Sequence, residues 1–203
     1  QHIYGNVEDI AFGGVGGTDY AMFPSSCNIS TFKRLTFLDG NYGHILSDSA
    51  NPFLYSTFEN LIMGDTATPG SGGYGLHLRN AANITFLNCG HLADIKLDTN
   101  SRSIRFLGMQ CESPAAGGTR PWFEADSTVW GVTLAHGALH WNAAETRPMV
   151  KFTGSRGITI DDMVIEDLVS VAGRSWIVLD GVLFSRITRC LAYSTNTFNF
   201  IEC

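Results

Sequence analysis

The tripeptide Ile84-Thr85-Phe86 places one polar residue between two apolar ones, and this alternation recurs along the chain at spacings of 20 to 29 residues. Successive side chains of a β-strand point to opposite faces, so each copy predicts a short strand with one buried face. The copies are Ile10-Ala11-Phe12, Leu35-Thr36-Phe37, Leu61-Ile62-Met63, Ile84-Thr85-Phe86, Ile104-Arg105-Phe106, Val132-Thr133-Leu134, Ile158-Thr159-Ile160 and Ile187-Thr188-Arg189. A strand that returns at this period is typical of a repeat architecture.

A second apolar alternation precedes most of these copies by 7 to 10 residues. It reads Phe53-Leu54-Tyr55, Leu76-His77-Leu78, Ile95-Lys96-Leu97, Phe123-Glu124-Ala125, Val150-Lys151-Phe152 and Ile177-Val178-Leu179. Apolar residues such as Met163-Val164-Ile165 follow several copies and indicate a third strand in each repeat. Two or three strands in every ~25 residues, with no helical segment between them, predict an all-β solenoid whose coils stack about 4.8 Å apart.

Three other architectures that contain short strands fit the sequence less well. A leucine-rich repeat requires the pattern LxxLxLxxN, which the chain lacks. A β-propeller needs about 40 residues per blade. A β-sandwich is also made of short strands, but its strands do not recur so regularly in sequence. The repeat therefore favours a solenoid, in which each coil buries its apolar face against its neighbours.

Composition and charge narrow the class of protein. Of the 203 residues 44% are hydrophobic, which predicts a globular chain, and only 16% are charged. The net charge is −6 and the 13 Lys and Arg residues do not cluster, so we expect no binding of nucleic acid. No apolar run reaches the roughly 18 residues of a membrane-spanning helix, so we expect no insertion into a membrane.

Asn or Gly stands directly before several copies of the tripeptide, as in Asn60-Leu61, Asn83-Ile84, Gly131-Val132 and Gly157-Ile158. With these steps the chain resembles the right-handed parallel β-helix of the pectate-lyase-like superfamily and, within it, bacteriophage tailspikes and capsule depolymerases. The resemblance implies a right-handed parallel β-helix, here of about eight coils, and a polysaccharide as partner. It also implies a virion (tail) location if the source is a phage, and otherwise a secreted protein. The family's arginine base and calcium-binding aspartates do not align with this sequence.

The ends of the chain and one smooth face suggest assembly. We expect residues 1–203 to form a single β-helix domain. Neither end carries an amphipathic capping helix, so we expect a piece of a longer protein or a unit covered by neighbouring chains. The middle residues of the tripeptides are mostly small and uncharged, which suits packing against another chain. Since tailspikes are parallel trimers, the resemblance implies a homotrimer.

The phase of the second alternation gives candidate site residues. Its apolar residues face inward, so the residues beside them face outward on one long face. The predicted outward residues are His77, Arg79, Asp94, Lys96, Asp98, Trp122, Glu124, Asp126, Lys151, Thr153, Trp176 and Asp180. Stacked in register, Lys96 lies between His77 and Glu124, with about 5 Å between neighbours in a column.

This outward face has side chains that suit cleavage of a glycan. In the predicted stack Asp98 lies between Arg79 and Asp126, with Glu124 close by. Two carboxylates about 5 Å apart suit a retaining glycosidase and about 6.5–9.5 Å an inverting one, and their repulsion would keep one of them protonated. The predicted catalytic residues are Glu124, Asp126 and Asp98, and the predicted substrate-binding residues are Trp122, Lys96, His77, Arg79 and Lys151.

Several functions fit this pattern. The first is a tailspike-like enzyme that binds and degrades capsule or O-antigen without a cofactor or a metal. The second is a non-catalytic adhesin or structural spike segment, on which opposite charges satisfy one another across neighbouring strands. The third is a secreted polysaccharide lyase, with Lys96, His77 or Arg79 as its base.

Two further groups of residues are rivals for the site. Asp161-Asp162 and Glu166-Asp167 form an acidic cluster that we expect on a turn after the second strand. It is either a solvated turn or a second acid or calcium site. His136 and His140 would form a metal-binding pair only on a helix, and the strand context argues against one.

Overall fold

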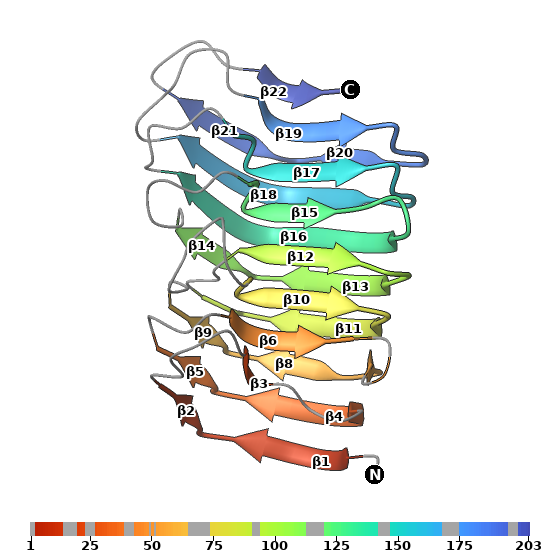
Figure 1. Ribbon diagram of the computed structural model, residues 1–203. Helices are drawn as coiled ribbons and strands as arrows, with labels where there is room; N and C mark the ends of the chain where they lie inside the picture. Colours follow the sequence, from red (N-terminus) through yellow and green to blue (C-terminus); the bar gives the residue numbers. More distant parts are fainter. Residues whose placement is uncertain are drawn as a thin grey trace.

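A computed structural model shows an all-β chain, stacked from the N-terminus at one end to the C-terminus at the other (Figure 1), and the residues that it describes form 22 strands. The residues that it describes are 3–13, 20–22, 27–38, 43–48, 50, 52–64, 74–90, 94–112, 120–141, 147–167, 175–194 and 199–203. None of these segments forms a helix of the length and apolar character that a transmembrane span requires.

The strands form three sheets. The eleven-stranded sheet contains β1 (Ile3–Glu8), β4 (Cys27–Lys33), β7 (Phe53–Leu54), β8 (Thr57–Glu59), β11 (Ala82–Leu87), β13 (Arg102–Leu107), β14 (Gln110–Glu112), β16 (Trp130–Trp141), β18 (Thr159–Asp167), β20 (Arg186–Thr188) and β21 (Leu191–Ser194). The eight-stranded sheet contains β3 (Tyr20–Met22), β6 (Gly43–Ser47), β10 (Leu76–Arg79), β12 (Ile95–Asp98), β15 (Phe123–Ala125), β17 (Val150–Thr153), β19 (Ser175–Asp180) and β22 (Asn199–Glu202). The three-stranded sheet contains β2 (Ala11–Phe12), β5 (Thr36–Phe37) and β9 (Ile62–Met63).

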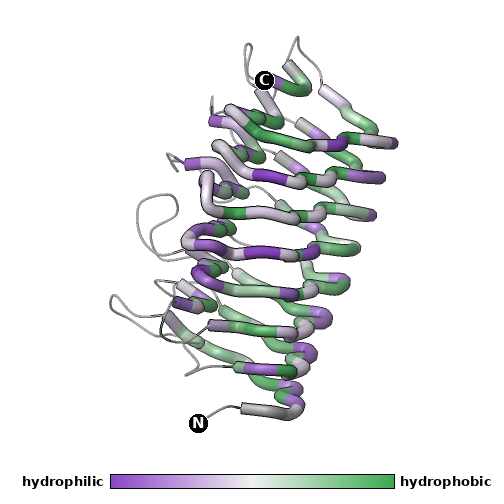
Figure 2. The backbone as a smooth tube through the Cα atoms, turned by 90° about the vertical axis from the view of Figure 1, so that its right-hand side faces the viewer, coloured by the Kyte–Doolittle hydropathy of each residue, from purple (hydrophilic) through white to green (hydrophobic). Residues whose placement is uncertain are grey.

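The chain alternates between the sheets, and the paired strands of the three sheets run parallel. The main path of the eleven-stranded sheet has eight strands, from β1 to β20, and the second sheet has eight, from β3 to β22. In each of these two orders, six of the eight strands lie between two neighbouring strands. The side view in Figure 2 shows the coils one above another. The predicted all-β parallel solenoid is confirmed.

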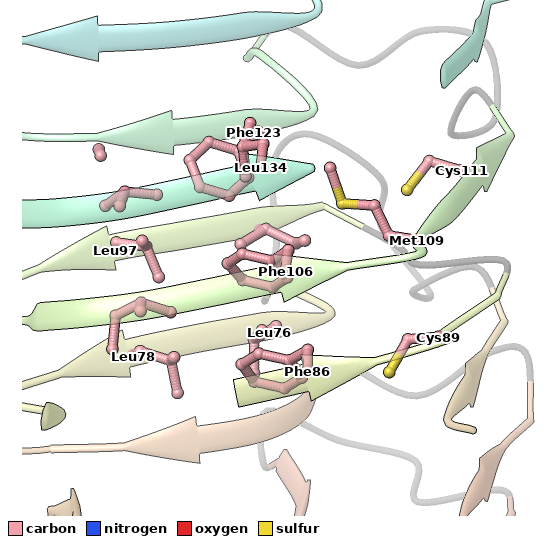
Figure 3. Packing of buried hydrophobic residues seen from close by; sticks show 14 of the residues in the cluster. Leu76, Leu78, Phe86, Cys89, Leu97, Phe106, Met109, Cys111, Phe123 and Leu134 are labelled. Carbon is pink, nitrogen blue, oxygen red and sulfur yellow. The ribbon is translucent and has the colours of Figure 1, made fainter. Parts of the chain in front are cut away.

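The core is a set of stacked columns between the sheets. Phe32, Phe58, Phe86 and Phe106 occupy equivalent positions on successive coils, with ring centroids 4.6, 4.9 and 4.7 Å apart and nearly parallel rings. Figure 3 shows Phe86 and Phe106 one above the other, and the register continues the column to Leu134. Offset-stacked rings gain more than their area alone provides, so the spacing between parallel strands also suits the aromatic column.

Each coil bends at residues with a left-handed backbone. One such column has a positive φ at every coil, at Asp9, Arg34, Asn60, Asn88, Gly108, His136, Asp162 and Arg189. The backbone amides of these column residues still donate to the next coil, as from Asn60 N to Leu87 O and from Asn88 N to Leu107 O. Asn and Gly adopt this conformation at least cost, which explains the residues that precede many of the strands.

The register corrects part of the predicted repeat. Leu35-Thr36-Phe37 lies on the short three-stranded sheet, in line with Ala11-Phe12 and Ile62-Met63. The partners of Thr85-Phe86 are instead Thr57-Phe58, which in turn pair with Thr31-Phe32. The tripeptides therefore belong to two different columns, and this explains their uneven spacing. Phe53-Leu54 likewise belongs to the eleven-stranded sheet and not to the charged face.

The smooth face that supported a homotrimer is consequently split between two sheets. Thr31, Thr57 and Thr85 continue to Thr133 and Thr159 on the eleven-stranded sheet, with Arg105 interrupting the column. All five threonines are half-buried and Arg105 is exposed. The homotrimer stays a prediction.

Candidate functional site

The outer face of the eight-stranded sheet is the predicted charged face, and its register agrees with the sequence. His77 pairs with Lys96, Lys96 with Glu124, and Glu124 with Lys151 on four successive strands. In the next outward column Arg79 pairs with Asp98. Seven of the eight predicted site residues therefore lie near one another on this face, and they include Asp126, which follows β15.

Trp122 is the predicted site residue that the structure places elsewhere. Its exposed fraction is 2%, and it packs in the core cluster next to Phe123, with ring centroids 5.9 Å apart. Trp176, at the equivalent position, is fully buried as well. Both side chains lie at or near the start of a strand, where the coil turns a corner and two-residue alternation does not apply. The prediction that Trp122 stacks on a sugar is wrong.

A tyrosine that the sequence analysis missed organises the middle of the charged face. Tyr74 donates a short hydrogen bond to Oε1 of Glu124, and Nζ of Lys96 donates to the same oxygen at 3.1 Å. The Arg120 guanidinium stacks 3.6 Å from the centroid of the Tyr74 ring and pairs with Asp94, with 3.2 Å between Nε and Oδ2. These contacts join residues 26 to 50 positions apart, and no local pattern marks them.

Asp98 is the most enclosed of the predicted catalytic carboxylates, with 8% of its surface exposed. Its Oδ2 lies 3.0 Å from Nε2 of His77, its Oδ1 lies 3.4 Å from Nε of Arg79, and the Thr99 hydroxyl donates to Oδ1. Burial raises the pKa of Asp98, but the hydrogen bonds and charges of these neighbours outweigh burial, so the pKa lies below its ordinary value of 3.8. The carboxyl is therefore ionised at neutral pH.

This lowered pKa predicts an acid-dependent loss of stability. A carboxyl whose pKa is lower in the folded than in the unfolded state stabilises the fold above the unfolded value, and that contribution disappears as the pH falls through the folded value. We expect the free energy of unfolding to fall below pH 3.8, the ordinary value for Asp98, and to fall less steeply in Asp98→Asn. Urea unfolding between pH 2 and pH 6 measures both slopes, and equal slopes would contradict the assignment.

Asp126 has a local structural role at the end of its strand. Its Oδ1 accepts hydrogen bonds from the Thr128 amide at 2.9 Å and from the Thr128 hydroxyl at 2.6 Å. This arrangement is a side-chain-capped turn. Asp126 borders, together with Lys96, Glu124 and Lys151, a hollow of about 100 Å³. Within the described part of the chain, Lys151 forms no ion pair, and it borders the hollow opposite in charge to Asp126.

The rival acidic cluster lies on a strand and not on a turn. Asp161, Asp162 and Glu166 all belong to β18. Asp162 pairs with His136 at 2.9 Å, Glu166 pairs with His140 at 2.8 Å, and Asp161 pairs with Arg189. Each acid thus has its own cationic or histidine partner on an adjacent coil. Among the residues that the structure describes, no group of three or more His, Cys, Asp or Glu side chains is arranged to hold a metal ion.

Comparisons with known proteins identify no family. No family model and no curated protein matches the chain. Two solved structures share some of its shape. One is QnrB1, a plasmid-mediated fluoroquinolone resistance protein, at 10% identity over 94% of this chain and 92% of that one, with a TM-score of 0.35. The other is PfbA, a surface adhesin of Streptococcus pneumoniae, at 13% identity over 97% and 71%, with a TM-score of 0.33. Scores this low carry no argument about function, and the fold assignment rests on the strand pairing.

Proposed function

We propose that this β-solenoid is a glycan-binding protein and that the outer face of its eight-stranded sheet contacts the sugar. The observation that carries the proposal is the hollow of about 100 Å³ lined by Lys96, Glu124 and Lys151. These side chains stand on adjacent strands and are held in register by backbone pairing. Fixed donors and acceptors suit the hydroxyl groups of a sugar, and Lys151, which forms no ion pair among the described residues, suits a negatively charged substituent.

The paired state of the carboxylates favours binding over cleavage. A general acid must hold a proton at the working pH. The low pKa of Asp98 leaves this group ionised, and two protein donors already occupy Oε1 of Glu124. Asp126 caps its turn. The repulsion that was expected to keep one carboxyl protonated is relieved because Lys96, His77 and Arg79 stand between or beside the acids.

A tailspike-like depolymerase remains the more specific hypothesis, with Glu124, Asp126 and Asp98 as catalytic residues. Only Glu124 and Asp126 of these three border the hollow, so they are the pair that a bound sugar would reach. Release of new reducing ends from a bound polysaccharide would support this hypothesis. Binding without release supports the non-catalytic adhesin.

The test is a titration of bacterial surface polysaccharides, acidic and neutral, against wild type and Lys151→Gln. We expect wild type to bind an acidic member of the panel. Lys151→Gln should bind it at least about tenfold more weakly, the size of one charge-assisted hydrogen bond. Isothermal titration calorimetry gives both constants.

Lys33→Gln is the matched control for this titration. Lys33 lies on the eleven-stranded sheet, where it pairs with Glu59 at 3.1 Å, and it does not border the hollow. This variant should bind as wild type does. The proposal fails if no polysaccharide of the panel binds, or if Lys151→Gln binds as tightly as Lys33→Gln.

A further inference from the structure

A second and larger hollow follows the bend between the eight-stranded and the eleven-stranded sheet. We call it the corner groove. Its volume is about 640 Å³, within the range of small-molecule sites. It shares no lining residue with the hollow on the charged face. Its lining includes Trp130, Gly131, Arg156, Gly157 and Phe184.

The groove exists because two glycines interrupt a column of side chains. At this bend one residue of each coil has a left-handed backbone, and the column runs Ile29, Tyr55, Asn83, Ser103, Gly131, Gly157 and Phe184. Ile29, Tyr55, Asn83 and Phe184 are exposed at the corner. Gly131 and Gly157, with φ of 70° and 66°, have no side chain, so the corner is open between Ser103 and Phe184.

Two aromatic rings border this opening. Trp130 is 49% exposed and Phe184 is 86% exposed. Phe184 also has a φ of 59°, a conformation that is costly for a bulky side chain. An exposed phenylalanine adds no core packing, so its ring is available to a ligand. Two uncovered rings beside a hollow offer flat apolar surfaces for a ligand.

Arginines lie on both sides of Trp130 in its own column. Trp130 pairs with Arg102 on one neighbouring coil and with Arg156 on the other. Both arginines are exposed, and within the described residues neither forms a hydrogen bond or an ion pair through its side chain. Guanidinium groups bind carboxylates and sulfates through paired hydrogen bonds. The ligand that this arrangement recognises is therefore a ring with an apolar face and an anionic substituent.

We propose that the corner groove binds a saccharide ring that carries a carboxylate or a sulfate. In this arrangement the sugar stacks on Trp130, and Arg156, which lines the groove, receives its negative charge. The hydroxyl group of Ser127 and the side-chain amide of Asn100 line the same groove and match the sugar hydroxyls. This site goes beyond the proposed function, because it lies on another face and does not depend on Lys151.

The test uses three probes with the intact protein: a tetrasaccharide of uronic acids, a sulfated oligosaccharide and a neutral tetrasaccharide. Of the three tryptophans whose burial the structure describes, Trp130 is exposed and Trp122 and Trp176 are buried, so tryptophan fluorescence should respond to a ligand in the corner groove. We expect at least one anionic probe to bind with a change in fluorescence and the neutral probe to bind at least about tenfold more weakly. The two anionic probes separate the carboxylate from the sulfate as the preferred group.

Three variants localise the binding. Trp130→Ala removes the stacking surface, and Arg156→Gln removes a cation. Gly157→Asn fills the floor of the groove with a residue type that Asn83 already supplies in the same column at φ 57°. Each should weaken binding at least about tenfold by calorimetry, the loss expected for one stacking or charged contact.

Arg105→Gln is the matched control. Arg105 is also an exposed arginine, but it lies on the outer face of the eleven-stranded sheet and does not line the groove. It should leave the affinity within about twofold of wild type. Circular dichroism and unfolding of every variant separate loss of binding from loss of fold.

The outcomes for the two sites are distinct. If both anionic probes fail to bind, or if Trp130→Ala and Arg156→Gln bind them as Arg105→Gln does, the corner groove is not a saccharide site. If Lys151→Gln abolishes binding of the same probes and the groove variants do not, the charged face binds the glycan and this inference is wrong.

Discussion

Phe86→Ala should lower the free energy of unfolding by about 3–5 kcal/mol, the range for removing a buried aromatic side chain. The exposed fraction of Phe86 is 1%, and its ring stacks on Phe58 at 4.9 Å and on Phe106 at 4.7 Å. A coil of a solenoid is stabilised mainly by its two neighbours. The cavity therefore weakens the contacts on both sides of the same coil. Chemical denaturation measures the loss.

Thr85→Ala is the control for this experiment because it changes the adjacent residue on the opposite face of the strand. Thr85 is half-buried and pairs with Thr57 and Arg105 on the outside of the sheet. Loss of such a cross-strand pair costs about 1 kcal/mol or less. If Phe86→Ala is no more destabilising than Thr85→Ala, the aromatic column does not hold the coils together.

Arg120→Met should destabilise the fold by about 3 kcal/mol at pH 7, because breaking an enclosed ion pair leaves one charge in a poorly solvated place. The Asp94 side chain is 2% exposed and the Arg120 side chain is 14% exposed, with 3.2 Å between Nε and Oδ2. The same substitution removes the guanidinium that stacks on Tyr74 at 3.6 Å. Tyr74 is therefore less firmly held against Glu124.

A double-mutant cycle separates the ion pair from packing. Asp94→Asn in the Arg120→Met background removes the charge that Arg120 no longer pairs, so the double variant should recover much of the lost stability. Urea denaturation of the wild type, the two single variants and the double variant gives the coupling energy. Additive losses in the double variant would show that the Asp94–Arg120 pair does not stabilise the base of the charged face.

The sequence predicted the fold because the physical cause of the fold is local and repeated. Alternation such as Leu76-His77-Leu78 and Ile95-Lys96-Leu97 indicates which face of each strand is buried. In the structure these two segments pair residue by residue. The register of the first coils was predicted wrongly, since Leu35-Thr36-Phe37 and Thr85-Phe86 show the same alternation on different sheets. Alternation alone does not distinguish two strands of one coil.

The candidate site was predictable only where strand phase determines it. The column from His77 to Lys151 follows from the phase and from the stacking of coils. The burial of Trp122 does not, because this residue precedes its strand at a corner. The contacts of Tyr74 with Glu124 and Arg120 depend on which residues the stacked coils bring side by side. No sequence motif marks Tyr74 or Arg120.

Hydrogen–deuterium exchange with a bound acidic polysaccharide tests the glycan-binding charged face most directly. Bound sugar slows exchange where it excludes water and restricts opening of the backbone. We expect protection of segments 95–98, 123–126 and 150–153, which carry Lys96, Glu124 and Lys151. We expect the same segments of Lys151→Gln to show little change at that concentration of polysaccharide. Saturating glycan that leaves the exchange of all three segments unchanged in wild type would contradict the account.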